Sequence, residues 1–182
     1  MDDFRPPVLI SEHEIRERVQ QLAARIDADY ADAGEILMLG VLRGAFIFLA
    51  DLSRLLTVPR RADFIALSSY ENGSVRGGVR LIMDARTSVT GRHVLIVEDI
   101  LDTGHTLAYL METFAARHPA SLRSCVLVRK PQPDVDVKVD YLGFDIPDEW
   151  VVGYGLDYGD RYRSLPYIGT VPLEARESPP HD

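Results

Sequence analysis

Three carboxylates and two hydroxyls follow the end of an apolar run in the stretch VLIVEDILDTGHTL, residues 94–107. The acids are Glu98, Asp99 and Asp102, and the turn after them consists of Thr103, Gly104, His105 and Thr106. Carboxylates accept hydrogen bonds from sugar hydroxyls, and they bind Mg²⁺ directly or through water. A helix that begins at such a glycine-containing turn presents free amide groups, which bind an anion such as phosphate. The stretch therefore predicts a site for a phosphate-bearing ligand that also carries a sugar or a metal ion.

A simpler interpretation of the same stretch is structural. Asp102 would then cap the helix, and Glu98 and Asp99 would be solvated surface charges. A helix cap needs only one such side chain. Three acids followed by a T-G-x-T sequence exceed this requirement, and we therefore favour the ligand site.

Strands and helices alternate along the chain around this stretch. Apolar runs predict core strands at residues 35–42, 62–70, 93–99 and 121–130. Helical spacing predicts helices at residues 9–30, where Ser11 and Glu14 form a capping box, and at residues 45–56 and 103–118. Together they predict an α/β fold with a mostly parallel sheet that is covered on both faces. Ligands bind such a sheet beyond the carboxyl ends of its strands, which is where the acids lie.

The remaining segments are shorter. Residues 71–78 are predicted to form a loop, because Gly, Asn and Ser dominate them, and residues 79–84 to return as a hairpin strand. Two short strands are predicted within residues 139–147 and 149–157. The last ten residues are predicted to be a frayed end.

The composition predicts a single cytoplasmic domain spanning residues 1–182. The formal charge of −8 argues against a general nucleic-acid surface. Cys125 is the only cysteine, which excludes a disulfide framework and predicts a buried, inert thiol. We find neither a signal peptide nor an apolar run long enough to cross a membrane, so no membrane partner is expected.

The stretch 94–107 closely resembles the phosphoribosylpyrophosphate (PRPP) signature of type I phosphoribosyltransferases, an apolar strand followed by two acids and D-T-G-x-T. Four other segments resemble the hypoxanthine-guanine branch of this family. They are its pyrophosphate loop (LGVLRGAFIFLADL, 39–52), the start of its mobile lid (SSYENG, 68–73), its purine-recognition lysine segment (LVRKP, 127–131) and its hood (143–171). The resemblance covers about residues 8–171. It implies a twisted sheet flanked by helices, with a small hood that the N-terminal segment completes and a tail at 172–182.

The resemblance also implies a reaction, in which the phosphoribosyl group of PRPP is transferred to N9 of hypoxanthine or guanine with release of pyrophosphate. Mg²⁺ is the implied cofactor. Glu98 and Asp99 are assigned to the ribose hydroxyls or to water molecules on Mg²⁺. Asp102 is assigned to the purine N7 proton as general base, and residues 102–106 to the 5′-phosphate. PRPP and a 6-oxopurine are thus the implied partners, and the family forms homodimers and homotetramers.

The other implied roles fall on residues far apart in the chain. Pyrophosphate is assigned to Arg43, Gly44 and Arg163, and a second Mg²⁺ to Asp157. The purine is assigned to Lys130, to stacking on Trp150 and to the backbone of Val151, and the lid anchor to Ser69 and Tyr70. In relatives, the peptide that corresponds to Leu42–Arg43 can be cis. Without the resemblance, Trp150 reads as a core residue and Asp157 and Arg163 as surface charges.

Two departures from the family pattern bear on these roles. His105 stands where the signature often has Lys or Arg, although backbone amides dominate a site of this kind. The segment from Lys130 to Gly143 is about one residue short, so Arg129 could hold the position of the purine-recognition lysine. We prefer Lys130 because it directly precedes Pro131, as in bacterial members.

Three other functions compete with this one. A transferase for xanthine, adenine or a pyrimidine would share the fold, but the hood sequence DEWVVGYGLDY disfavours the adenine and pyrimidine branches. An RNA-binding pyrimidine regulator would need a basic face, which the net charge of −8 disfavours. A PRPP-sensing module without catalysis would not need Asp102. The preference between hypoxanthine and guanine stays open.

Overall fold

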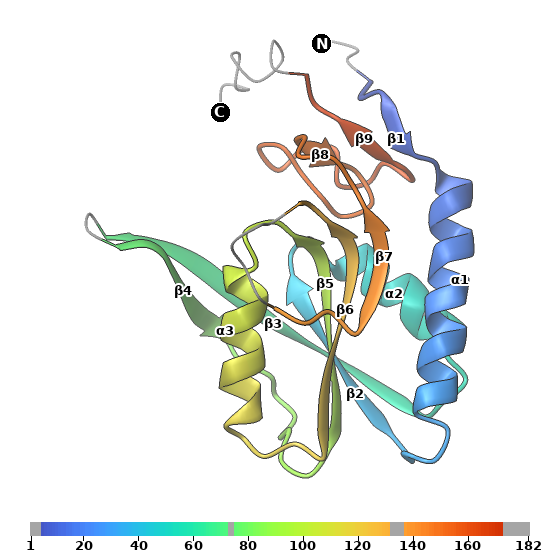
Figure 1. Cartoon of the computed structure of the whole chain (residues 1–182), viewed down its shortest axis with the longest axis vertical. Helices are drawn as coiled ribbons and strands as arrows, with labels where there is room; N and C mark the ends of the chain where they lie inside the picture. Colours follow the sequence, from blue (N-terminus) through green and yellow to red (C-terminus); the bar gives the residue numbers. More distant parts are fainter. Residues whose placement is uncertain (1–4, 73–74, 132–136, 173–182) are drawn as a thin grey trace.

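The computed structural model describes residues 5–72, 75–131 and 137–172 (Figure 1). Its main sheet contains β2 (Ile36–Leu42), β3 (Arg60–Asn72), β4 (Val75–Met83), β5 (His93–Leu101), β6 (Ser121–Arg129) and β7 (Tyr141–Asp145). The strand order is β4-β3-β2-β5-β6-β7. Neighbouring strands are parallel, except that β3 and β4 form an antiparallel hairpin. The predicted mostly parallel sheet is confirmed.

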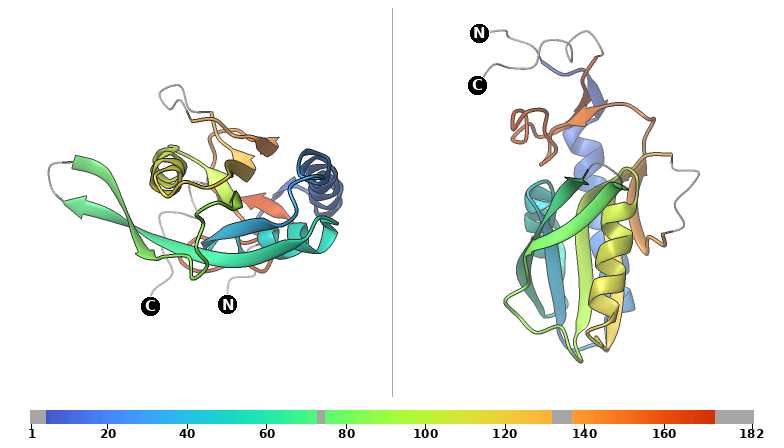
Figure 2. Two further views of the ribbon diagram at one scale, coloured as in Figure 1. Left: turned by 90° about the horizontal axis from the view of Figure 1, so that it is seen from below. Right: turned by 90° about the vertical axis from the view of Figure 1, so that its left-hand side faces the viewer.

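Helices cover both faces of this sheet (Figure 2). They are α1 (Glu12–Asp29), α2 (Phe46–Leu55) and α3 (His105–Ala115). Alternate residues of β2 enter two different cores: Met38 packs with α1 and α2, whereas Leu37 and Leu39 pack with α3. Side chains of a strand alternate between faces, so a strand covered on both sides must be apolar throughout. This explains the continuous apolar runs of β2 and β5.

A second, three-stranded sheet forms the hood. It contains β1 (Val8–Ile10), β8 (Val151–Val152) and β9 (Ile168–Thr170) in the order β1-β9-β8, with antiparallel pairing throughout. Figure 1 places this sheet beyond the carboxyl ends of the parallel strands. The N-terminal segment and the C-terminal segment thus meet in one sheet beyond these strand ends.

Most of the predicted elements are present, with shifted ends. The capping box of Ser11 and Glu14 is confirmed, because the Ser11 backbone N–H donates to Glu14 Oε2 at 2.8 Å and the Glu14 backbone N–H donates to Ser11 Oγ at 3.3 Å. The first helix starts later than predicted because Val8–Ile10 pairs with β9 instead. The third helix starts at His105, since Gly104 before it has a left-handed φ of 78°.

The loop predicted at residues 71–78 is wrong for the part that the structure describes. β3 continues to Asn72 and β4 begins at Val75, with Tyr70 opposite Gly78 and Asn72 opposite Val75. Antiparallel hydrogen bonds join backbone groups, so a strand pair forms here despite its glycine-rich composition. Residues 73–74 lie outside the described residues, as does the predicted frayed end beyond Pro172.

Two smaller predictions are also tested. Cys125 is fully buried, and burial raises the pKa of its thiol, as expected for an inert residue. Within the described part of the chain, no helix is long and apolar enough to cross a membrane.

Candidate active site

The turn between β5 and α3 forms a small cavity of about 150 Å³. Glu98, Asp99, Asp102, Thr103, Gly104 and Thr106 are among its lining residues. Gly104 is the N-cap of α3 and supplies no side-chain hydrogen bond, so the interpretation of Asp102 as the helix cap is wrong. The first amide groups of a helix have no partner within it, so they remain available to an anion. The exposed side chain of His105 lies outside this cavity.

Near the end of β5, Glu98 is buried and Asp99 is half-buried, contrary to the simpler interpretation of both as solvated surface charges. Glu98 is 5% exposed, and its Oε2 has no hydrogen-bond partner among the described residues. Burial, followed by the charge of Asp99, raises the pKa of Glu98 well above its usual value. Burial also raises the pKa of Asp99 to about 6, although nearby Arg163 opposes this shift. A buried carboxylate oxygen without a partner is costly, so the Oε2 of Glu98, beside a second carboxylate, indicates a functional site.

The segment after β2 lies directly against these acids. The peptide between Leu42 and Arg43 is cis. A Cβ at Gly44 would overlap the carboxylate of Asp99, so a side chain there would have to displace that carboxylate. A Cβ at Gly155 would in turn overlap the carbonyl oxygen of Gly44. The predicted pyrophosphate loop is therefore held between β5 and the hood.

Arg163 of the hood faces this loop and makes several polar contacts. Its Nη1 donates to the carbonyl oxygen of Gly155 at 2.8 Å, and its Nη2 lies 2.8 Å from Asp157 Oδ1 and 2.9 Å from Asp160 Oδ1. The side chain of Arg163 is 19% exposed. The interpretation of Asp157 and Arg163 as ordinary surface charges is therefore wrong.

Asp160 was missed by sequence reasoning. Its carboxylate also contacts Arg43, with Nη2 of Arg43 2.9 Å from Oδ1 and 3.0 Å from Oδ2. The two arginines assigned to pyrophosphate thus meet at one acid. The only local signal was the pair Gly159–Asp160, which suits a tight turn but does not indicate what the turn faces.

Lys130 and Arg129 point to different partners. The side chain of Lys130 is 10% exposed, and its Nζ lies 3.2 Å from Asp148 Oδ1 and 3.7 Å from Asp102 Oδ1. Arg129 instead donates from Nε to Asp145 Oδ1 at 2.7 Å. Of these two basic residues, Lys130 is the one that the fold brings to Asp102.

Trp150 is not the core residue that its type suggests. It is 47% exposed, and its ring packs edge-on against Tyr158 with 5.9 Å between the centroids. Its neighbour Val151 is buried in β8, opposite Thr170. An exposed aromatic face beside a fixed backbone edge is suited to a planar ligand.

Ser69 and Tyr70 lie on β3 rather than in a loop, opposite Val79 and Gly78 of β4. The predicted lid therefore starts as a hairpin strand. Gly73, the last residue of the segment that resembles the start of the lid, lies outside the described residues.

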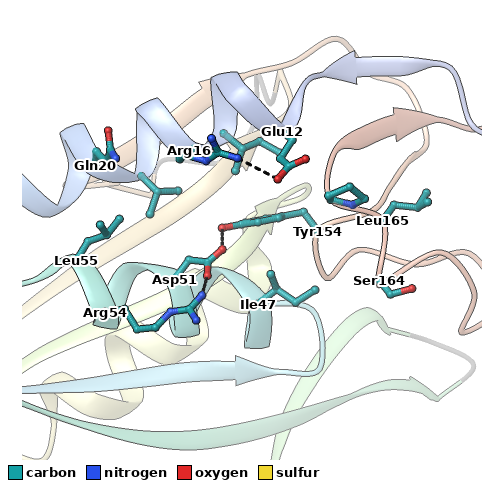
Figure 3. Close-up of a pocket in the computed structure, with 13 residues that line it drawn as sticks. Glu12, Arg16, Gln20, Ile47, Asp51, Arg54, Leu55, Tyr154, Ser164 and Leu165 are labelled. Atoms are coloured by element: carbon teal, nitrogen blue, oxygen red, sulfur yellow. Dashed lines mark hydrogen bonds and ion pairs between the residues drawn. The ribbon is translucent and has the colours of Figure 1, made fainter.

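A larger cavity of about 490 Å³ lies away from all of these residues, between α1, α2 and the hood (Figure 3). In its wall, the Tyr154 hydroxyl donates to Asp51 Oδ2 at 2.6 Å, and Arg16 pairs with Glu12 at 3.1 Å. Parts of the predicted pyrophosphate loop and hood line it, but none of the individual site residues assigned from the sequence does. Its size alone does not make it the substrate site.

Glu98 and Asp99 could supply only part of the coordination shell of a magnesium ion. Across residues 5–72, 75–131 and 137–172, no three His, Cys, Asp or Glu side chains are placed to hold a metal by themselves. Mg²⁺ usually takes one or two carboxylates and completes its shell with water and substrate phosphates. The partnerless Oε2 of Glu98 and the raised pKa of Asp99 are the features that a cation would relieve.

The fold and site together define a class. A parallel sheet with an acid-rich phosphate turn after a central strand, beneath an antiparallel hood, matches the type I phosphoribosyltransferase fold. Consistent with this, the sequence profile of the family described as "Phosphoribosyl transferase domain" matches residues 10–159.

Individual relatives are more specific. The chain is 47% identical over 169 residues to hypoxanthine phosphoribosyltransferase of Salmonella typhimurium, which covers 91% of this chain and 95% of the relative. It is 47% identical over 173 residues to hypoxanthine-guanine phosphoribosyltransferase of Bacillus subtilis, which covers 94% and 96%. The chain belongs to the hypoxanthine(-guanine) phosphoribosyltransferase family.

Solved structures agree with this assignment. A mutant hypoxanthine phosphoribosyltransferase of Trypanosoma cruzi in a ternary substrates complex superposes with a TM-score of 0.88 at 44% identity, covering 92% of this chain and 96% of that one. A hypoxanthine-guanine phosphoribosyltransferase of Bacillus anthracis gives a TM-score of 0.86 at 42% identity, covering 91% and 98%. The predicted family and fold are confirmed.

Proposed function

We propose that this enzyme acts in purine salvage and transfers the phosphoribosyl group of PRPP to N9 of hypoxanthine or guanine, forming IMP or GMP and pyrophosphate. The observation that carries this proposal is the 3.7 Å separation of Lys130 Nζ and Asp102 Oδ1 beside the phosphate turn. In a 6-oxopurine, O6 and N7 are neighbours on one edge of the base. A donor and an acceptor side by side match a carbonyl oxygen next to an N7 proton.

The side chains of this site act mainly by position and charge. The transition state resembles an oxocarbenium ion, so the protein has little covalent work to do. The turn at residues 102–106 holds the 5′-phosphate, and Glu98 and Asp99 receive the ribose hydroxyls. Asp102 accepts the N7 proton as N9 bonds to the anomeric carbon.

The leaving pyrophosphate is received on the opposite side of the ribose. Arg43, the backbone at Gly44 and Arg163 bind it, which is consistent with their convergence at one point. The base lies against the Trp150 ring, and the backbone of Val151 reads its edge. Closure of the lid at Ser69 and Tyr70 excludes water from the reactive cation.

Mg²⁺ is the proposed cofactor, with Glu98 and Asp99 at one position and Asp157 at a second. When bound, it neutralises the charge of the pyrophosphate leaving group. The burial of Glu98 supports a cation beside it, since an uncompensated buried carboxylate is unfavourable. We propose a homodimer or homotetramer, which light scattering on the purified protein would distinguish.

A panel of bases tests the function directly. Nucleotide formation is followed spectrophotometrically with PRPP, Mg²⁺ and hypoxanthine, guanine, xanthine, adenine or uracil. We expect turnover of hypoxanthine, guanine or both, and poor or no turnover of the others. Xanthine as the preferred base would favour the xanthine-specific alternative. Absence of product with every base, together with salt-sensitive RNA binding, would favour the regulator instead.

A further inference from the structure

Asp160 joins the two arginines that the proposed function assigns to pyrophosphate. Its Oδ1 lies 2.9 Å from Nη2 of Arg43 and 2.9 Å from Nη2 of Arg163. The arginines come from different parts of the fold, the loop after β2 and the hood. One carboxylate therefore occupies the point where both guanidinium groups converge.

The backbone of the hood aims Asp160 at this point. Gly159 and Asp160 have φ values of 57° and 60°, and Tyr158 and Arg161 exchange backbone hydrogen bonds of 3.2 and 3.1 Å across them. Two central residues with positive φ are typical of a tight two-residue hairpin turn, in which Gly and Asp are favoured. The backbone N–H of Asp160 also donates to Asp157 Oδ2 at 2.8 Å. The carboxylate is thus placed by a rigid turn.

The contacts are charged but accessible to solvent. The side chains of Arg43 and Asp160 are 67% and 57% exposed. The Asp160 carboxylate lies between two guanidinium groups, and an aspartate in such a setting is ionised at neutral pH. Exposed ion pairs contribute little net stability, so a ligand with more negative charges can displace them.

We propose that Asp160 is a positioning residue that stands in for a phosphate group of pyrophosphate in the free enzyme. It keeps Arg43 and Arg163 converged, and the pyrophosphate end of PRPP displaces it on binding. This inference rests on the proposed function. Because the carboxylate competes with the ligand for the same donors, it weakens the binding of pyrophosphate and thereby assists its release.

Asp160→Asn and Asp160→Gly test the competition. Asparagine and glycine both tolerate a positive φ, so either substitution retains the turn while it removes the charge. Binding of inorganic pyrophosphate with Mg²⁺ is measured by calorimetry, and KM values for PRPP and hypoxanthine by steady-state kinetics. We expect the Kd for pyrophosphate and the KM for PRPP to fall about two- to fivefold, with the KM for hypoxanthine unchanged.

Glu149→Gln is the matched control, because it removes the same charge from an exposed hood residue outside this cluster. If the control also bound pyrophosphate more tightly, the effect would come from the change in net charge alone, and this would overturn the role of Asp160. Equal or weaker binding in both Asp160 variants would also overturn it, and would make Asp160 a permanent orienting partner. If the wild-type protein bound neither pyrophosphate nor PRPP, the proposed function itself would fail.

Discussion

Gly155 of the hood packs against the backbone of Gly44 in the proposed pyrophosphate loop, with no room for a side chain between them. Gly44 packs in the same way against the carboxylate of Asp99 at the end of β5. Three segments distant in the sequence are thus stacked through two glycines. The spacing of the proposed substrate-binding groups depends on these close approaches.

We expect Gly155→Ala to push the hood away from this loop and to lower kcat/KM for PRPP by on the order of 10²-fold. The new methyl group would overlap the carbonyl oxygen of Gly44, and φ at Gly155 is 108°. Gly34→Ala is the control, because Gly34 also has a positive φ but has open space around its Cα. It should lower the melting temperature without lowering kcat/KM. Wild-type kinetics in Gly155→Ala would show that the contact is not needed.

Asp102→Asn should lower turnover about 10²–10⁴-fold, the usual effect of losing a general base. The amide keeps the shape of the side chain but cannot accept the purine proton. PRPP binding, measured by calorimetry, should stay close to that of the wild type, because the phosphate turn relies on backbone groups. An unchanged turnover number would remove Asp102 from the mechanism.

Lys130→Ala should raise KM for hypoxanthine much more than KM for PRPP, whereas Arg129→Ala should leave both nearly unchanged. The reason is that Lys130 Nζ lies beside Asp102, while Arg129 is directed to Asp145. Wild-type enzyme should reject adenine, by about 10⁴–10⁵ in kcat/KM, since a lysine has no acceptor for an amino group. If only Arg129→Ala weakened base binding, Arg129 would hold the recognition position. Comparable kcat/KM values for adenine and hypoxanthine would contradict the assignment of the substrate.

PRPP binding should require Mg²⁺. Glu98 and Asp99 face a polyanionic ligand, and without a cation their charges oppose it. Calorimetric titration of PRPP should show tight binding with Mg²⁺ and little binding in excess chelator. Equal affinity in the two conditions would contradict the role assigned to these acids.

Asp99 should make the ligand-free protein less stable as pH rises. Burial raises its pKa from 3.8 to about 6, so its contribution to stability is present below about pH 4 and is lost as pH rises through 6. Asp99→Asn should therefore increase the free energy of unfolding at pH 7.5 by on the order of 1–3 kcal/mol. Urea denaturation in chelator at pH 5 and 7.5 measures this.

Asp84→Asn is the control, because it should change the free energy of unfolding at pH 7.5 in the opposite direction. A hydrogen bond from Arg117 lowers the pKa of Asp84, so this carboxylate contributes stability at neutral pH that is lost as pH falls. Its removal should reduce stability at pH 7.5. A less stable Asp99→Asn variant at pH 7.5 would show that burial of this acid is already compensated in the ligand-free protein.

Local patterns in the sequence predicted most of the helices and core strands and the turn between β5 and α3, but not β1 or the length of the β3–β4 hairpin. The capping box of Ser11 and Glu14 and the turn at residues 102–106 depend on residues a few positions apart. The continuous apolar runs of β2 and β5 indicate strands that are buried on both faces, and such a run can be recognised within one segment of the sequence. Short-range spacing determines such features, so they can be predicted without the tertiary structure.

The tertiary structure decided which distant residues meet. β1 pairs with β9 at the other end of the chain, and Asp160 lies between Arg43 and Arg163, which no local pattern indicates. The exposure of Trp150 and the burial of Glu98 contradict what their residue types suggest. Burial and pairing depend on the path of the whole chain, because each contact joins segments that are close only after folding. The sequence alone therefore determined most of the strands and helices and the turn at residues 102–106, whereas folding decided how the hood and the proposed pyrophosphate loop come together.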